Sequence, residues 1–285
     1  MTLSHPIRCL VADVDGTLVT PDKEVTADAR DAVRALKAAG VGFAFVSSRP
    51  PRGLQGIATA LELQPDADSN GPRRPAAAAF NGGALLDSRL QPIAFEALGA
   101  DDARIALDLF AAMGVDAWVF TLDDWILTDP AGHYVAHEQH TVGFAPRVVA
   151  SFDGVTGIGK IVGSSADPDL LERAELALQP RLSTAARALR SQTYYLDVTN
   201  ANADKGSALR AIAEHAGLAL DEMAAIGDMV NDLAMLEIAG FAIAMGNAPA
   251  EVKAAADAVT ASNSDEGFAK AVHALVLPRA TKEVS

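Results

Sequence analysis

Apolar runs of strand length alternate with helical periodicities in the first eighty residues. Residues 7–12, apart from Arg8, and residues 42–46 are apolar runs, as expected of strands buried on both faces. Between them, residues 28–39 place apolar side chains three and four positions apart, which predicts a helix that ends at Gly40. A third apolar run, residues 76–80, stops at a glycine-rich turn. This alternation predicts a parallel sheet whose strands are joined by helices.

The last third of the chain repeats the same pattern. Apolar runs of strand length cover 223–226 and 241–244, and helical periodicities cover 205–216, 231–238, 248–256 and 267–277. In the first third, residues 53–61 add a short helix, and the proline- and charge-rich residues 64–75 predict an exposed, mobile loop. The two ends of the chain are therefore predicted to build one α/β domain with a parallel sheet.

The middle of the chain has a different pattern. Paired strand candidates lie at 117–121, 125–128 and 159–162, and helical periodicities lie at 101–113 and 168–178. Such a group of strands with two helices indicates a separate α+β domain. We therefore expect one domain formed by residues 1–83 and 191–285, with an α+β domain, residues 84–190, inserted into it.

Composition limits the partners that this protein can have. Its 285 residues are enough for two domains, and half of them are hydrophobic. The formal net charge is −14, from 23 basic and 37 acidic side chains. Such a charge repels nucleic acid and anionic membranes, so we expect neither as a partner. The same charge repels free anions, so any small phosphorylated metabolite would need local positive charge to bind. The sequence leaves the oligomeric state open.

The single cysteine, Cys9, lies in the first apolar strand and is expected to be a small buried residue. One cysteine forms no disulfide within the chain, which favours a reducing cytoplasm. Residues 1–8 show no signal-peptide pattern. The longest apolar region, residues 105–122, is interrupted by Asp108 and Asp116, so no membrane span is expected.

The sequence DVDGTL, residues 13–18, directly follows the first predicted strand. Ionised carboxylates such as those of Asp13 and Asp15 tolerate burial only when they are paired, hydrogen-bonded or metal-bound. Gly16 allows the chain to turn sharply after them. The segment therefore indicates a cation and catalytic chemistry, although an aspartate-rich turn is an alternative for the hexapeptide alone.

A second acidic segment, GDMVND at residues 227–232, follows another predicted strand. Hard cations such as Mg²⁺ take oxygen ligands and need only a few carboxylates, which Asp13, Asp15 and Asp228 could supply. The alternative is structural, with Asp228 as a helix cap and Asp232 in the first turn, where the helix dipole favours acids.

Two further positions complete a candidate phosphate site. Ser47 follows the second predicted strand, and its hydroxyl and nearby backbone N–H groups can hold phosphoryl oxygens. Lys205 begins a predicted helix and adds positive charge at its N-terminus. In isolation, Ser47 could be a helix cap and Lys205 a solvated surface residue. We interpret them as one site because ligands of parallel sheets bind at the carboxyl ends of the strands.

These segments together resemble a known family. In chain order they are DVDGTL, SSR after the second strand, FNGG, ADKG, GDMVND and AMGNAPAEVK. This order is similar to the Cof-type branch of the haloacid dehalogenase-like hydrolases, most of which are phosphatases. The resemblance covers the first 83 residues and those after about residue 197. It implies a Rossmann-like parallel-sheet core with a mobile α/β cap inserted after the third core strand.

The resemblance also implies roles for single residues. Asp13 would attack phosphorus and become an aspartyl-phosphate. Asp15 would protonate the leaving alkoxide and then activate water. Mg²⁺ would be held by Asp13, the backbone carbonyl of Asp15, and Asp228. Ser47 and Lys205 would hold the phosphoryl oxygens, and Asn231 would contact phosphate or substrate. Asp232 would orient Lys205 or a metal-bound water, and Thr17 would secure the nucleophile loop.

The second motif departs from the family pattern. Where the family commonly has Thr-Gly-Arg, this chain has Ser47-Ser48-Arg49. Ser47 keeps the hydroxyl that contacts phosphate. Ser48 adds bulk and one hydrogen-bond donor near the substrate, which bears on substrate size. Arg49 either contacts the substrate or forms a surface salt bridge.

Two other motifs match only in part. GVTGIGK at 154–160 lacks the Ser or Thr that a phosphate-binding P-loop needs after its lysine, and Ile161 opens a strand-like run. Lys160 is therefore interpreted as a residue of the cap. HEQH at 137–140 is one residue short of the zinc-binding HExxH spacing, so a polar cap surface is the preferred interpretation. Trp118, Asp123, Asp124 and Trp125 either reach the substrate or pack in a core and a hairpin turn.

The sequence thus predicts a Mg²⁺-dependent phosphatase that acts on small phosphomonoesters, with sugar phosphates as the leading class. One alternative is a sugar phosphomutase, which would return the phosphoryl group to a sugar. Another is a receiver-like signalling domain, which also uses acids at strand ends, Mg²⁺ and a lysine. Asp15 argues against the receiver, since a base beside the nucleophile promotes hydrolysis of the aspartyl-phosphate.

Overall fold

The computed structural model describes residues 5–63 and 75–280, so the expected loop at 64–75 lies almost wholly outside the described residues. Contacts divide the chain into two compact units. The first unit comprises Met1–Ser48, Gln55–Ile93 and Asp204–Ser285, and the second comprises Arg49–Leu54 and Ala94–Ala203. Within the parts described, no helix has the length and apolar character needed to span a bilayer.

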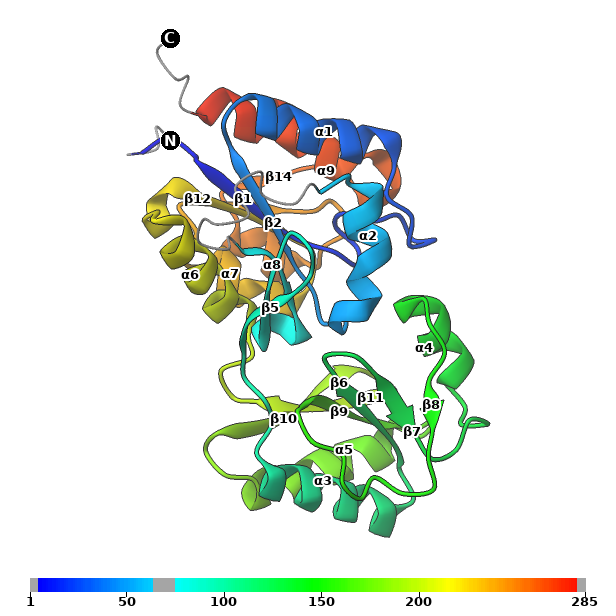
Figure 1. Cartoon of the computed structure of the whole chain (residues 1–285). Helices are drawn as coiled ribbons and strands as arrows, with labels where there is room; N and C mark the ends of the chain where they lie inside the picture. The colour runs from blue at the N-terminus through cyan, green and yellow to red at the C-terminus, as the bar shows by residue number, and fades with distance from the viewer. Residues whose placement is uncertain (1–4, 64–74, 281–285) are drawn as a thin grey trace. The chain divides into compact units, whose positions relative to one another are not determined.

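The first unit is built on an eight-stranded sheet in the order β14-β13-β12-β1-β2-β3-β4-β5 (Figure 1). The strands are β1 (Cys9–Asp13), β2 (Gly42–Val46), β3 (Pro75–Ala79), β4 (Ala84–Asp87), β5 (Pro92–Phe95), β12 (Met223–Gly227), β13 (Phe241–Ala244) and β14 (Ala258–Val259). From β14 to β3 all neighbouring strands are parallel, and β4 runs antiparallel to β3. This is the α/β core with a Rossmann-like sheet that the sequence predicts.

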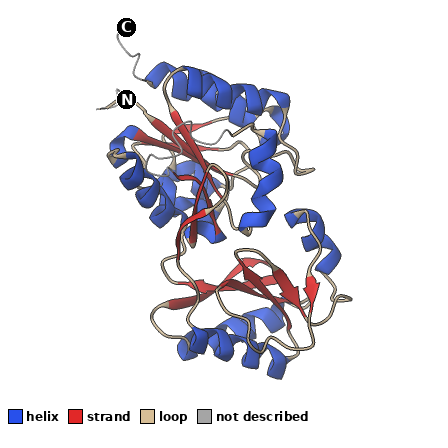
Figure 2. Ribbon diagram, in the orientation of Figure 1, coloured by secondary structure: helices blue, strands red, loops and turns tan. Residues whose placement is uncertain are grey.

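Helices cover both faces of this sheet (Figure 2). They are α1 (Ala27–Ala38), α2 (Gln55–Ala60), α6 (Lys205–Ala216), α7 (Leu233–Leu236), α8 (Ala250–Ala255) and α9 (Gly267–Ala271). Alternate residues of the central strands, such as Val11 and Ala225, pack against α6, α7 and α8 in one apolar cluster. The alternation follows from the strand period of two, which sends every second side chain to the same face. The strands are therefore held rigidly, with their carboxyl ends along one edge.

The second unit contains a six-stranded sheet in the order β10-β11-β9-β6-β7-β8. Its elements are α3 (Ala100–Met113), β6 (Asp116–Thr121), β7 (Trp125–Leu127), α4 (Val135–Val142), β8 (Arg147–Val148), β9 (Ile158–Ser164), α5 (Pro168–Leu178), β10 (Ala186–Gln192) and β11 (Tyr195–Asn200). Neighbouring strands are antiparallel except for the parallel pair of β7 and β8. One face of the sheet packs against α3 and α5, which gives this unit its own core.

The division into units differs from the expected boundaries at residues 84 and 190. Strands β4 and β5 continue the core sheet beyond β3, and β10 and β11 belong to the second sheet. The hydrophobic pattern did not predict β10, because its last residues, ALRSQ, do not alternate between apolar and polar side chains. Residues Arg49–Leu54 also group with the second unit, which no local pattern indicates.

Some predicted helices are shorter in the structure. The expected helix at 231–238 is a 3₁₀ turn at Val230–Asp232 followed by the single turn of α7. The expected helix at 267–277 changes after α9 into a π-helical turn, Val272–Val276. Apolar periodicity reports which face is buried but does not separate α-helical from tighter or wider turns.

Candidate active site

Three parallel strands of the first unit end side by side and bring the expected acids together. Strand β1 ends at Asp13, which lies opposite Val46 at the end of β2. On its other side β1 pairs with β12, which ends at Gly227, immediately before Asp228. Because parallel strands share one direction, their carboxyl ends meet at a single edge of the sheet. Asp13, Ser47 and Asp228 are therefore neighbours despite their separation in sequence.

Lys205 is placed among these acids by the start of α6. The N-cap Asp204 accepts a hydrogen bond from the backbone N–H of Ser207, which fixes the first turn of the helix. The Lys205 side chain is only 2% exposed, and its Nζ lies 2.5 Å from Oδ1 of Asp13 and 2.5 Å from Oδ1 of Asp232. The lysine is therefore held as a buried bridge between two carboxylates.

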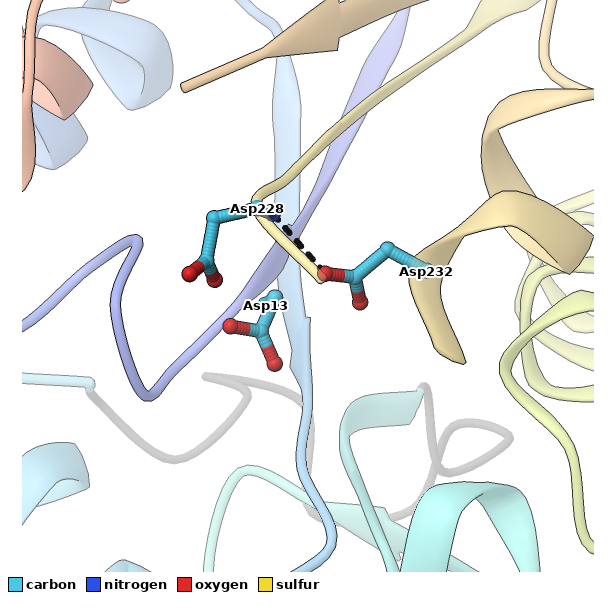
Figure 3. A group of neighbouring side chains, drawn as sticks. All are labelled: Asp13, Asp228 and Asp232. Carbon is cyan, nitrogen blue, oxygen red and sulfur yellow. Dashed lines mark hydrogen bonds between the residues drawn. The ribbon is translucent and has the colours of Figure 1, made fainter. Parts of the chain in front are cut away.

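The two carboxylate oxygens of Asp232 accept hydrogen bonds from different parts of the site. Its Oδ1 accepts a hydrogen bond from Lys205, and its Oδ2 accepts the backbone N–H groups of Asp228 and Met229, each at 2.8 Å. Figure 3 shows the Asp232 carboxylate turned toward the backbone of Asp228. The acid in the turn after β12 thus shapes the backbone that carries Asp228 and also positions the lysine.

Asp228 is oriented from the DVDGTL loop and from the segment after β13. Thr17 Oγ1 donates to its Oδ1 at 3.1 Å, and Asn247 Nδ2 donates to its Oδ2 at 3.1 Å. The same Asn247 amide donates to the backbone carbonyl of Gly16 at 2.9 Å. Gly16 has φ +89°, and a Cβ there would lie 2.3 Å from Asp228 Oδ2. Only glycine lets the loop approach this carboxylate so closely.

The electrostatics of the site reflect three carboxylates gathered in a buried space. Asp13, Asp228 and Asp232 each offer an oxygen, and these oxygens lie within 4.8 Å of one another (Figure 3). Burial raises the pKa of Asp13 well above its usual range, Lys205 opposes this rise, and the neighbouring Asp232 and Asp228 add to it. Burial and Asp232 raise the pKa of Asp228 to about 6. For Lys205, burial alone would lower the pKa, but Asp13 and Asp232 raise it overall.

The donor set fits a hard divalent cation. All the donors are oxygens, and a bound cation would offset the repulsion that raises the two aspartate pKa values. Asp232 is already engaged with Lys205 and two backbone N–H groups, which leaves Asp13 and Asp228 as the carboxylates for the metal. The Asp15 side chain is not part of the cluster, since it pairs with Lys23 at 2.9 Å. Its expected contribution through the backbone carbonyl remains a prediction.

The remaining expected residues are distributed around the strand ends. Ser47 is buried, its N–H donates to Ala78, and its carbonyl accepts from the N–H of Asn81. Asn231 is exposed, with its Nδ2 3.5 Å from Asn81 Oδ1. Ser48 is half-buried beside Ser47. Arg49 is buried and groups with the second unit, and its expected contact with substrate stays a prediction.

Comparison with known proteins agrees with this geometry. Residues 10–272 match the family model of a haloacid dehalogenase-like hydrolase. YxeH of Bacillus subtilis, which is named as a phosphatase, is 30% identical over 279 residues, which cover 95% of this chain and 99% of YxeH. The chain belongs to the haloacid dehalogenase-like hydrolase family.

Two other similar proteins extend this result. The 5-amino-6-(5-phospho-D-ribitylamino)uracil phosphatase YwtE of Bacillus subtilis is 26% identical, with 92% of this chain and 96% of YwtE covered. A crystal structure of a haloacid dehalogenase-like hydrolase from Bacteroides thetaiotaomicron superposes with a TM-score of 0.84 at 26% identity, covering 94% of this chain and 98% of that one. With phosphatases among the relatives that match more than nine-tenths of its length, this hydrolase is a phosphatase.

Two residues near the strand ends, Lys23 and Asn247, were not predicted from the sequence. Lys23 reaches Asp15 because the turn from Thr20 to Glu24 folds the chain back, a contact with no sequence signal. Asn247 lies within the motif AMGNAPAEVK, so a signal existed, but only the fold shows that its amide joins Gly16 to Asp228.

The partial motifs have structural explanations in this hydrolase. Lys160 lies within β9, which confirms the strand interpretation of the segment after GVTGIGK. His137 and His140 both belong to α4. In residues 5–63 and 75–280, the group able to hold a metal is the aspartate cluster and contains no histidine.

Proposed function

We propose that this phosphatase is Mg²⁺-dependent and hydrolyses small phosphomonoesters, sugar phosphates first, through an aspartyl-phosphate on Asp13. The observation that carries the proposal is the buried bridge of Lys205 between Asp13 and Asp232, beside the Asp228 carboxylate. A nucleophilic carboxylate, a buried cation and a second carboxylate for a metal are the components that phosphoryl transfer to an aspartate requires.

The first step is attack by an Asp13 carboxylate oxygen on phosphorus. The bond between phosphorus and the ester oxygen breaks, and the phosphoryl group becomes covalently attached to Asp13. Lys205 keeps the carboxylate in place and offers N–H donors for the phosphoryl oxygens, with Ser47 contributing its hydroxyl from the neighbouring strand end. Mg²⁺ held by Asp13 and Asp228 would neutralise part of the negative charge of nucleophile and phosphate when bound.

Asp15 acts first as the general acid and then as the general base. It donates a proton to the departing alkoxide, and the resulting carboxylate then takes a proton from the water that hydrolyses the aspartyl-phosphate. Inorganic phosphate and the alcohol leave, and Asp13 returns to its starting form. In the structure, Asp15 Oδ1 pairs with Lys23 Nζ at 2.9 Å.

Phosphate release is the experiment that tests the proposal. Glucose 6-phosphate, ribose 5-phosphate, nucleoside monophosphates and p-nitrophenyl phosphate would be incubated with the enzyme in Mg²⁺ or in EDTA. We expect release that requires Mg²⁺, is highest with a sugar phosphate, and is abolished in Asp13→Asn. Asp169→Asn, an exposed aspartate in the first turn of α5, is the matched control and should keep full activity.

A second measurement examines the covalent intermediate. With Asp15→Asn, mass spectrometry after a short incubation with substrate should reveal phosphate on the peptide that contains Asp13, because the water is no longer activated. Turnover by Asp13→Asn would refute the nucleophile. Phosphate returned to a second position of the sugar, in place of release, would favour the mutase. A phosphoenzyme that persists in the wild type would favour the receiver-like role.

A further inference from the structure

Two asparagines of the first unit hold the loop that follows β1 at two points. Asn247 Nδ2 donates to the backbone carbonyl of Gly16 at 2.9 Å, and Asn263 Nδ2 donates to the backbone carbonyl of Val19 at 2.9 Å. The two asparagines are also joined to each other, since the backbone N–H of Asn263 donates to Asn247 Oδ1 at 3.1 Å. We call Asn247 and Asn263 the asparagine pair. It fixes both ends of the segment from Gly16 to Val19.

The chemistry of its partners fixes the orientation of the Asn247 amide. A backbone carbonyl and an ionised carboxylate only accept hydrogen bonds, and a backbone N–H only donates. The NH₂ group of Asn247 therefore points toward Gly16 and Asp228, and its oxygen points toward the backbone N–H of Asn263. An amide turned by half a rotation would face each partner with the wrong atom. The side chain thus has one favourable position.

The turn that carries Asn263 is itself tightly built. It begins as the 3₁₀ turn η6, Asn263–Asp265, and the side chain of Ser262 caps its start. The backbone N–H of Gly267 closes the turn by donating to the Ser262 carbonyl at 3.0 Å. A Cβ on Gly267 would lie 2.1 Å from the carbonyl oxygen of Ala261, so the chain packs too closely here for any side chain. The asparagine pair therefore rests on a packed segment of the core unit.

Asn247 connects this segment to two groups expected to bind the cation. It donates to Asp228 Oδ2 at 3.1 Å, while Thr17 Oγ1 donates to Oδ1, so each oxygen of the carboxylate has its own donor. Donors on both oxygens oppose rotation of the carboxylate about its terminal bond. The Gly16 carbonyl that Asn247 also holds belongs to the residue directly after Asp15, whose own carbonyl is an expected metal ligand. A backbone ligand is oriented only by holding the backbone around it.

We propose that the asparagine pair positions the cation ligands, Asp228 by its side chain and Asp15 by its backbone, and thereby sets the affinity of the site for Mg²⁺. The inference rests on the proposed function, which supplies the cation. Every residue in this arrangement belongs to the first unit. The carboxylates provide the attraction for Mg²⁺, and the asparagines provide the geometry. Both are positioning residues because they act through the ligands.

Exposure separates this role from a purely structural one. Asn247 is exposed and Asn263 is half-buried, so water can replace the hydrogen bonds that alanine removes at either position. Water satisfies Asp228 and the Gly16 carbonyl without holding them in one orientation. The Tm of the metal-free variants should therefore stay within about 2 °C of the wild-type value. The affinity for Mg²⁺ should fall, because only binding depends on the orientation of the ligands.

Thermal unfolding in a series of MgCl₂ concentrations measures this affinity without turnover, since a ligand of the folded state raises Tm according to its Kd. In Asn247→Ala the Kd for Mg²⁺ should rise by about tenfold or more. In Asn263→Ala it should rise by only about threefold, because the backbone N–H at this position still donates to Asn247. Asn202→Ala, at an exposed asparagine between β11 and α6, is the matched control and should leave the Kd unchanged.

Phosphate release from p-nitrophenyl phosphate gives a second readout. Activity that Asn247→Ala loses at low Mg²⁺ should return as Mg²⁺ is raised, because mass action offsets a weaker site. A loss of activity that is the same at every Mg²⁺ concentration would contradict a role in positioning the cation ligands.

The outcomes distinguish this inference from the proposed function. A Kd of Asn247→Ala within about twofold of wild type overturns the inference and leaves the proposed function intact, whether or not the metal-free Tm falls. An equal rise of Kd in Asn202→Ala overturns it as well. A wild type whose Tm does not respond to Mg²⁺ also overturns the inference. If EDTA then leaves phosphate release unaffected, the cation of the proposed function fails with it.

Discussion

The ammonium of Lys205 lies 2.5 Å from a carboxylate oxygen of Asp232, and both side chains are almost completely buried. Lys205 makes an equally short contact with Asp13, so one cation stands between two acids. The Asp232 carboxylate also receives two backbone N–H groups and therefore cannot follow the lysine if it moves. Asp232 thus holds Lys205 toward Asp13, and under the proposed function we expect it to act as a positioning residue.

Replacing Asp232 with asparagine should weaken both catalysis and folding. The amide keeps the volume but removes the charge, which leaves Lys205 with a single buried counter-ion. We expect kcat to fall by about 10- to 100-fold, as for other groups that orient a reacting residue, and the free energy of unfolding to fall by about 3 kcal/mol. Steady-state kinetics and urea denaturation measure the two effects. Asp31→Asn, an exposed ion pair with Arg34, should change neither appreciably.

A methyl group at Gly16 should disturb the metal site specifically. In Gly16→Ala, the new Cβ would lie 2.3 Å from Asp228 Oδ2, in a backbone conformation with φ +89°. The matched control is Gly40→Ala, where φ is +72° and no atom lies within 4 Å of the added Cβ. Both variants should lose about 1 kcal/mol of stability through the positive φ. Only Gly16→Ala should also need more Mg²⁺ for half-maximal activity, and equal Mg²⁺ requirements would contradict this.

Stabilisation by Mg²⁺ should depend on pH. Burial raises the pKa of Asp228 to about 6 and that of Asp13 above its usual range, so the folded protein binds protons more tightly than the unfolded chain. Stability of the metal-free protein should therefore fall as pH rises from about 4 to 6 and stay lower above that window. Mg²⁺ competes with those protons. Thermal unfolding should show a larger Mg²⁺-induced rise in Tm at about pH 7.5 than at about pH 5, and the reverse order would refute the cation site.

Cys9 should be inert in the folded protein. Burial raises the pKa of its thiol to about 12, and the side chain is only 5% exposed. At pH 8 only about one thiol in ten thousand would be ionised, and the thiolate is the reactive form. Ellman's reagent should therefore detect one thiol in guanidinium chloride and essentially none in the native protein. Rapid native labelling would place Cys9 outside the sheet core.

Local patterns sufficed for much of the α/β core and for the acids of the site. Asp13 and Asp228 directly follow apolar runs, and side chains at the carboxyl ends of parallel strands must share an edge, so their proximity follows from strand direction alone. The cap was less accessible, because β10 carries no regular alternation and its partner β11 is recognised only through pairing across the sheet.

Contacts distant in sequence decided the rest. The sequence alone determined which acids end the core strands and that a lysine begins α6, because periodicity and helix caps act over a few residues. Only the tertiary structure decided that Asp232 completes the carboxylate cluster while Asp15 turns to Lys23, and that Asn247 joins Gly16 to Asp228. It also decided which face of the second sheet carries the tryptophans and Lys160. These outcomes depend on strand register and loop closure, which are set by packing across the whole domain and leave no local trace.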